Sequence, residues 1–211
     1  MTPVTSSFTS IERSFIGTLA ADITAHLPPE TLSGAVYIGS FFSTAHIPLY
    51  ATSFASEQVV GMTSPDSTQQ ALKAAVITFS DGIFDPYSDC DPYSPEDARV
   101  RRMHRWDVQS TWLGYGVHQT SLDRAFVIAR SQDTTRLFEM GKEGFPILIL
   151  HGTQDALIRP EKLVEDAKEH FTNVKIALVE NGTHAVFHEN PSETMEHIGT
   201  FVEEVQKKVS V

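Results

Sequence analysis

Two short apolar runs dominate the hydrophobic pattern in the last third of the chain. Residues Phe145–Leu150 are apolar without interruption, and Val174–Val179 contain one polar residue, Lys175. Runs of this length are typical of strands buried on both faces of a parallel sheet. A helical pattern that opens at Pro160 lies between them, and strand–helix–strand order predicts two parallel neighbours. A third strand is predicted at Ala35–Gly39.

Apolar residues at helical spacing predict amphipathic helices on either side of these strands. The first helix follows Ser14 and ends before Pro28-Pro29, and the last begins near Pro191. The expected core-facing positions are Phe15, Leu19, Ile23 and Leu27 in the first helix, Leu163, Val164 and Ala167 in the helix after Pro160, and Met195, Ile198, Val202 and Val205 in the last.

The chain divides into three parts by composition. Residues 1–13 contain no apolar run and are predicted to be an irregular segment, whereas 14–211 form one α/β domain. Within this domain, a mostly helical insertion is predicted at about 41–143. Its first part, 40–63, has a loop-like composition rich in Ser, Thr and Ala, and helices are predicted at 69–79, from Ser94, at 108–115, at 122–129 and at 134–140.

The bulk composition limits the classes of function. A net charge of -11 and a pI near 5.2 argue against nucleic acid and anionic membrane surfaces as partners. No apolar run approaches the ~18 residues that span a bilayer, and residues 1–10 lack the pattern of a secretory signal. A single cysteine, Cys90, excludes an intrachain disulfide framework. These features predict a cytoplasmic protein.

An acid and a histidine each follow one of the two apolar runs. Asp155 comes after His151-Gly152-Thr153-Gln154, and His184 comes after Asn181-Gly182-Thr183. The carboxyl ends of parallel neighbours meet at one sheet edge, where catalytic groups collect. The pair has the chemistry of the acid and base of a nucleophile–His–acid triad. Asp155 could instead be a turn acid or helix cap, and His184 an ordinary loop histidine.

The stretch Pro146–Phe201 resembles the C-terminal part of the α/β-hydrolase fold. The similarity lies in Pro-Ile-Leu-Ile-Leu-His-Gly-Thr-Gln-Asp, in Glu-Asn-Gly-Thr-His-Ala-Val-Phe-His-Glu-Asn-Pro and in the terminal helix. The resemblance implies that Asp155 is the catalytic acid and His184 the general base. It also implies an α/β-hydrolase-like parallel sheet with a helical lid, and a small-molecule substrate. The sequence contains no nucleotide fingerprint, P-loop or zinc-type Cys/His spacing, so we expect no cofactor or metal. Only about the latter two-thirds of a full hydrolase is matched, so we expect an N-terminally truncated sheet whose unpaired edge favours self-association.

The resemblance places the nucleophile at Ser14, because in that family the nucleophile precedes the acid and the histidine. The family presents this serine on a Gly-x-Ser-x-Gly turn between a strand and a helix. Here Glu12 and Ile16 occupy the two glycine positions, Gly17 is retained, and the strand that should lead into the turn is predicted to be missing. The alternative interpretation of Ser14 is a helix N-cap.

The remaining candidate residues carry weaker signals. The acidic stretch 85–97 contains Asp-Pro-Tyr-Ser twice, which could be a calcium loop but better fits turn chemistry, since it lacks the glycine and the order of an EF-hand. Cys90 within it is expected to be inert. His151 is expected to be a core neighbour of its strand and His188 a surface residue, and packing or surface roles are expected for His46, His104 and His118.

Three functions are consistent with these residues. The first is a serine hydrolase acting on a small ester or related acyl substrate through Ser14, His184 and Asp155. The second is an inactive or impaired hydrolase remnant that acts as a binding or interaction protein. The third, an aspartate-nucleophile relative such as an epoxide hydrolase or dehalogenase, is disfavoured because no Asp stands at the elbow position.

Overall fold

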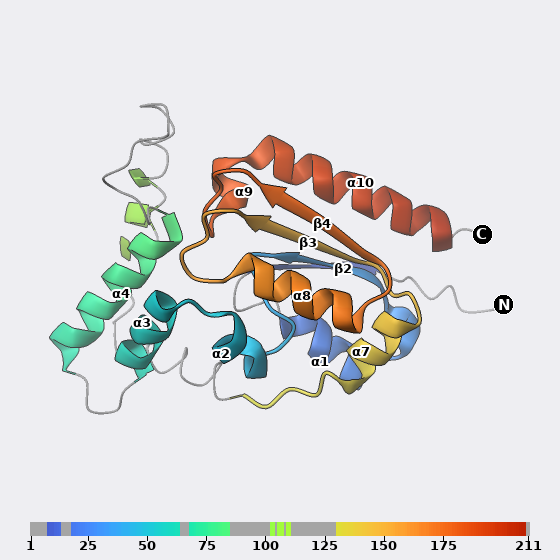
Figure 1. Cartoon of the computed structure of the whole chain (residues 1–211), viewed down its shortest axis with the longest axis horizontal. Coiled ribbons are helices and arrows are strands. Elements are labelled where there is room, and N and C mark those ends of the chain that lie inside the picture. Colours follow the sequence, from blue (N-terminus) through green and yellow to red (C-terminus); the bar gives the residue numbers. More distant parts are fainter. Residues whose placement is uncertain are drawn as a thin grey trace.

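The computed structural model describes residues 8–13, 18–63, 68–84, 102–103, 105–107, 109–110 and 130–209. Its strands form one parallel sheet whose order follows the chain, β1-β2-β3-β4 (Figure 1). Their bounds are β1 Phe8–Arg13, β2 Leu32–Ile38, β3 Ile147–Gly152 and β4 Val174–Val179. All the carboxyl ends therefore lie along one edge, as the two apolar runs predicted.

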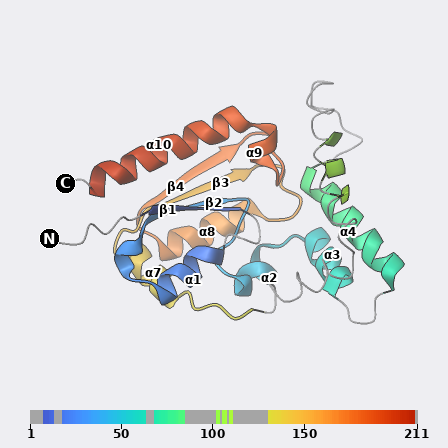
Figure 2. The ribbon, with the colours of Figure 1, turned by 180° about the vertical axis from the view of Figure 1, so that it is seen from behind.

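Helices cover both faces of this sheet. The long helix α10 (Pro191–Val209) packs on one face, and α1 (Leu19–His26), α7 (Thr135–Lys142) and α8 (Pro160–His170) lie on the other (Figures 1 and 2). In β2, Ala35 and Tyr37 belong to one buried cluster, and Val36 and Ile38 belong to the other. The central strands are apolar at successive positions because both of their faces are buried. Full burial of one such side chain stabilises the fold by about 1.5–3 kcal/mol.

The N-terminal segment differs from the prediction. Residues 8–13 of the expected irregular segment form β1, which pairs in parallel with β2, so the strand that leads toward Ser14 is present. Its sequence lacks an apolar run because it is an edge strand of the described sheet, and Ile11 remains 54% exposed. Backbone pairing rather than side-chain burial on two faces accounts for this strand.

The buried face of α1 was predicted in part. Leu19 and Leu27 are exposed, whereas Ile23 packs against the core and Ala20, Ala21 and Thr24 are buried. Small side chains allow the helix to lie close to its neighbours, and α1 packs mainly against α7. In α10, one predicted core-facing residue is wrong, because Met195 is exposed. Ile198 and Val205 are buried as predicted, and Thr194 and Phe201 are buried beside them.

The described part of the 41–143 insertion contains more helix than expected. The predicted loop 40–63 contains η3 (Thr44–His46), α2 (Ile47–Tyr50) and α3 (Ser53–Thr63), with η2 (Pro29–Thr31) preceding β2. Thr52 explains α3 locally, because its hydroxyl accepts the N–H of Ala55 at 3.1 Å and caps the first turn. Helix α4 (Gln69–Phe84) runs five residues beyond its predicted end, and the helices expected at 94, 108–115 and 122–129 fall wholly or mainly outside the described residues.

Helices α3 and α4 pack on each other beyond the carboxyl ends of β3 and β4, next to the short helix α9 (Val186–Glu189) (Figure 1). This arrangement places helical walls over the edge that carries Asp155 and His184. Across the part of the chain that the structure describes, no helix has both the length and the apolar character that a membrane span needs.

Candidate active site

The loops after β3 and β4 are locked together by backbone contacts. Thr153 N–H donates to Val179 C=O at 3.0 Å, and Gln154 N–H donates to Gly182 C=O at 2.9 Å. A Cβ atom at Gly152 would lie 2.2 Å from the Gly182 oxygen, so only glycine allows this approach. The two glycines of the sequence motifs thus bring Asp155 and His184 to adjacent loops.

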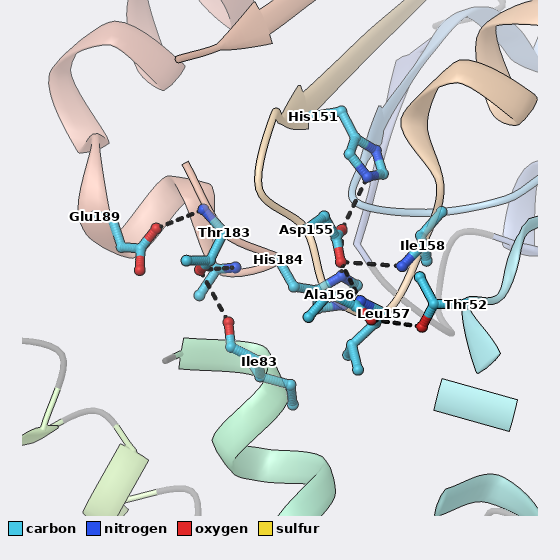
Figure 3. A network of polar contacts seen from close by, with 11 residues as sticks. Thr52, Ile83, His151, Asp155, Ala156, Leu157, Ile158, Thr183, His184 and Glu189 are labelled. Carbon is cyan, nitrogen blue, oxygen red and sulfur yellow. Dashed lines mark hydrogen bonds and ion pairs between the residues drawn. The ribbon is translucent and has the colours of Figure 1, made fainter. Parts of the chain in front are cut away.

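Asp155 is buried and its carboxylate is fully bonded (Figure 3). Oδ1 accepts the N–H groups of Leu157 at 2.7 Å and Ile158 at 3.0 Å, and Oδ2 accepts Nδ1–H of His184 at 2.8 Å. Burial alone would raise the pKa of Asp155, but the charges and N–H groups of His184 and His151 outweigh burial and hold that pKa well below its usual value. Asp155 is therefore a fixed carboxylate at neutral pH.

His184 is held from three sides. Its Nδ1 points to Asp155, and Gly39, just past β2, lies so close that a Cβ there would be 3.2 Å from Nδ1. Gly39 has a φ of 51°, a conformation that favours glycine. The neighbouring Thr183 donates its hydroxyl to Ile83 C=O in α4 at 2.9 Å, and its N–H donates to Glu189 at 2.8 Å. Because Nδ1 must carry a hydrogen to bond a carboxylate, Nε2 is left with a lone pair, as a general base requires.

His151 also reaches the acid. It is completely buried, as expected of a core residue, but its Nε2 lies 2.9 Å from Asp155 Oδ2, the oxygen that His184 contacts. The sequence interpretation missed this contact. The signal was present in the spacing, because a four-residue turn after a strand, here Gly152–Asp155, can return an acid to the strand's last side chains.

A small apolar cavity lies beside His184, with about 20 Å³ of space for the centre of a water-sized sphere. Among its described lining residues only His184 has a polar side chain. The remaining lining residues come from the loop after β2, from α2 and α3 with the turn between them, from α4 and from the turn after Asp155: Phe41, Ile47, Ala51, Ala55, Val59, Phe79, Leu157 and Ile158. The cavity can receive an apolar group while presenting it to one imidazole.

Ser14 lies outside the described residues, in the connection between β1 and α1. Both flanks of that connection are fixed: Arg13 pairs with Ile38 at the end of β2, and buried Thr18 accepts a hydrogen bond from Arg130 at 2.6 Å. Thr18 occupies the N-cap position of α1, and the interpretation of Ser14 as a helix cap falls on a residue outside the described ranges.

The other histidines have no contact with Asp155 that the structure records. His46 Nδ1 bonds Ser43 at 2.9 Å and its ring stacks on Tyr50, while His188 lies against Phe187 in α9. His104, His118, Cys90 and the acidic stretch 85–97 are outside the described residues.

Among the described residues, one cluster has metal-ligand chemistry. Potential ligand atoms of Asp166, Glu169 and His170 on α8 lie within 4.8 Å of one another. Asp166 already accepts the Tyr50 hydroxyl, and the ring of His170 stacks on Phe138 with centroids 4.0 Å apart. These contacts account for the cluster as packing, and we assign it no ligand.

Comparison with known proteins gives structural relatives only. No family model matches the sequence, and no curated protein matches it. Similar solved structures include the esterase RhEst1 from Rhodococcus sp. ECU1013 (20% identity, TM-score 0.70, 96% of this chain and 67% of that one). A bromoperoxidase from Bacillus anthracis is 20% identical with a TM-score of 0.63, over 92% of this chain and 67% of that one. The α/β hydrolase MGS-M2 from a Medee basin deep-sea metagenome library is 18% identical with a TM-score of 0.63, over 94% of this chain and 66% of that one.

These relatives confirm the fold that the sequence motifs predicted. Nearly all of this chain superposes on them, and it spans about two-thirds of their length. The chain has the α/β-hydrolase fold. Identity near 20% does not transfer an activity or a substrate, so function has to be argued from the site itself.

Proposed function

We propose that this α/β-hydrolase-fold chain is a serine hydrolase that cleaves small esters or related acyl compounds. The observation that carries the proposal is the 2.8 Å bond between His184 Nδ1 and Asp155 Oδ2, in a buried site whose base borders an apolar cavity. An imidazole held in one tautomer by a fixed carboxylate is suited to accept and return a proton.

Ser14 is the proposed nucleophile. β1 and β2 are parallel and end together at Arg13 and Ile38, and the residue after Ile38 is Gly39, which touches His184. The residue after Arg13 is Ser14, so the chain enters the β1–α1 connection one strand away from the base. Parallel order and the strand-to-helix change at this point match the nucleophile position of the fold.

The proposed reaction has two steps. Ser14 Oγ attacks the acyl carbon while His184 Nε2 takes the hydroxyl proton, and the same nitrogen returns the proton to the departing alcohol. Water then attacks the acyl-enzyme, giving its proton to His184, and the carboxylic acid leaves as Ser14 regains its hydrogen. Asp155 remains ionised throughout and stabilises the imidazolium.

The insertion at about 41–143 is the proposed lid. Its described helices α3 and α4 supply Ala55, Val59 and Phe79 to the cavity wall. They are also tied to both catalytic loops, since Thr52 donates to Ala156 C=O at 2.5 Å and Thr183 donates to Ile83 C=O. A wall bonded to the acid and base loops would fix the acyl pocket relative to the chemistry and keep water out of it.

A panel of p-nitrophenyl esters with acyl chains of two to twelve carbons tests the proposal. We expect turnover that is highest for short chains, because the space that the cavity leaves beside His184 is small, and we expect it to be lost in His184→Ala. His188→Ala is the matched control and should retain activity, since its ring packs on Phe187. Equal activity of the His184→Ala variant and the native chain would refute the proposal.

A further inference from the structure

His151 has a contact that core packing does not explain. It lies at the end of β3 with no exposed surface, and its Nε2 is 2.9 Å from Asp155 Oδ2 (Figure 3). At this distance an imidazole nitrogen and an ionised carboxylate oxygen attract each other only when the nitrogen carries a hydrogen, so the contact is a close ion pair that falls short of an aligned hydrogen bond. Oδ2 therefore faces the N–H of His184 in a hydrogen bond and the N–H of His151 in this ion pair.

This arrangement has a cost on the far side of the ring. Neither ring nitrogen of His151 has an aligned hydrogen-bond partner among the described residues, and Nδ1 has no charged neighbour that compensates for its burial, whereas Nε2 has the ion-pair contact with Asp155. Burying an unpaired polar atom destabilises the fold, which an apolar side chain of similar volume would avoid. The contact with Asp155 is what the histidine adds over an apolar residue.

We propose that His151 is a positioning residue that fixes the Asp155 carboxylate and shares its charge, so that Asp155 does not hold the proton of His184 too tightly. The inference rests on the proposed hydrolase mechanism, in which His184 must be a free base before each attack. Two N–H groups on one oxygen compete, because each draws electron density that the other would otherwise receive.

The charged groups around this oxygen come from three elements. Asp155 belongs to the loop after β3, His184 to the loop after β4 and His151 to β3 itself. From α9, Glu189 accepts the N–H of Thr183, next to His184. Of these, His151 is the group whose removal takes a donor from Oδ2 without removing the acid or the base.

Replacing His151 by Leu and by Gln tests this role. Leu fills similar volume without a donor, whereas the Gln amide nitrogen can reach the place of Nε2. We expect the midpoint of the His184 ring titration, followed by NMR, to move to higher pH by about 0.5–1 unit in His151→Leu. The acidic limb of kcat/KM should move in the same direction, and kcat at neutral pH should fall by roughly tenfold. His151→Gln should restore most of each change.

The two readouts separate this inference from the proposed function. A shifted His184 titration in a chain that cleaves no ester would overturn the hydrolase proposal and leave the role of His151 standing. Ester turnover with unchanged titration and acidic limb in a folded His151→Leu variant would overturn the inference alone. If the Leu variant does not fold, His151→Asn, whose amide is too short to reach Oδ2, replaces it against His151→Gln, and identical behaviour of these two would count against a donor role.

Discussion

The carboxyl edge of the sheet carries two halves of the proposed site that are built in different ways. The acid–base half lies in two loops tied by backbone bonds and by the close approach of Gly152 to Gly182. The nucleophile half is the β1–α1 connection, which begins at an edge strand with one exposed face and contains Glu12 and Ile16 where the family has glycine.

The two halves differ in how far apart in the sequence the residues lie that build each of them. Asp155 and His184 meet because short loops with glycine follow two adjacent strands, a pattern contained in about forty residues. The β1–α1 connection relies on partners far along the chain, since Thr18 is held by Arg130 and Gln132. We therefore expect substitutions in the acid–base half to change activity through the chemistry of Asp155 and His184 and through the fit of their two loops. In the nucleophile half, we expect Ser14 alone to contribute to the chemistry.

The largest effect is expected for Ser14→Ala. Loss of the nucleophile should lower kcat for ester hydrolysis by on the order of 10⁴-fold or more, while the free energy of unfolding changes little. Steady-state kinetics and urea unfolding measure the two quantities. Ser56→Ala, an exposed serine of α3, is the control and should match the native chain. Full activity of Ser14→Ala would show that the nucleophile half lies elsewhere.

The next largest effect is expected for Asp155→Asn. An asparagine amide nitrogen in place of Oδ2 cannot accept the Nδ1–H of His184, so the imidazole loses the tautomer in which Nε2 carries no hydrogen. We expect kcat to fall by about 10³–10⁴-fold with a small change in KM. Asp166→Asn on α8 serves as the comparison. A drop of less than tenfold for Asp155→Asn would contradict the role of the acid.

Acid unfolding should also report on Asp155. Its pKa in the folded chain is held below the ordinary value of 3.8 by His184 and His151 despite burial, so the ionised form stabilises the fold. This contribution is complete above about pH 4 and is lost as the pH falls further, because the unfolded state then binds the proton first. The free energy of unfolding, followed by urea titration between pH 6 and pH 2, should fall less steeply in Asp155→Asn than in the native chain.

A smaller effect is expected for Gly39→Ala, which perturbs the contact between the two halves. The new Cβ would lie 3.2 Å from both the ring and the carbonyl oxygen of His184, at a φ of 51°. We expect a loss of about 1–2 kcal/mol in stability and roughly 10–100-fold in kcat through displacement of the base. Gly199→Ala in α10, where no atom lies within 4 Å of the new methyl group, should be neutral or slightly stabilising.

The smallest effect is expected for Thr183→Val. This change removes the hydroxyl that links the base loop to Ile83 in α4 and keeps the side-chain shape. Stability should fall by about 1 kcal/mol, and activity should change by only a few-fold. Thr200→Val at an exposed position of α10 provides the reference. A loss of activity as large as that of Asp155→Asn would mean that α4 takes part in the chemistry itself.

Sequence patterns predicted the elements whose side chains are buried on two faces. β2 and β3 follow from their apolar runs, and the proximity of Asp155 to His184 follows from parallel strand ends, while their catalytic roles stay predictions. β1 could not be recognised because an edge strand needs few apolar residues. The exposure of Leu19 could not be predicted, because the small Ala20 and Ala21 let α1 pack closely while the larger Leu19 points outward.

The contact of His151 with the acid was missed for a different reason. A histidine at the end of an apolar run looks like a core residue until the following turn is known to bring Asp155 back to it. In β4 the alternation of buried Ala177 and Val179 with exposed Ile176 and Leu178 was likewise hidden in an apolar run. The position of β4 in the sheet, which the sequence does not contain, decides the exposure of Ile176 and Leu178, whereas the turn Gly152–Asp155 decides the contact of His151.

The most direct test is reaction of the purified chain with a fluorophosphonate probe, which labels activated serines, followed by intact mass and location of the adduct. We expect one adduct per chain, on Ser14, and none in the His184→Ala variant. The proposed triad is contradicted if the folded native chain forms no adduct, if the adduct lies on another serine, or if labelling of Ser14 does not depend on His184.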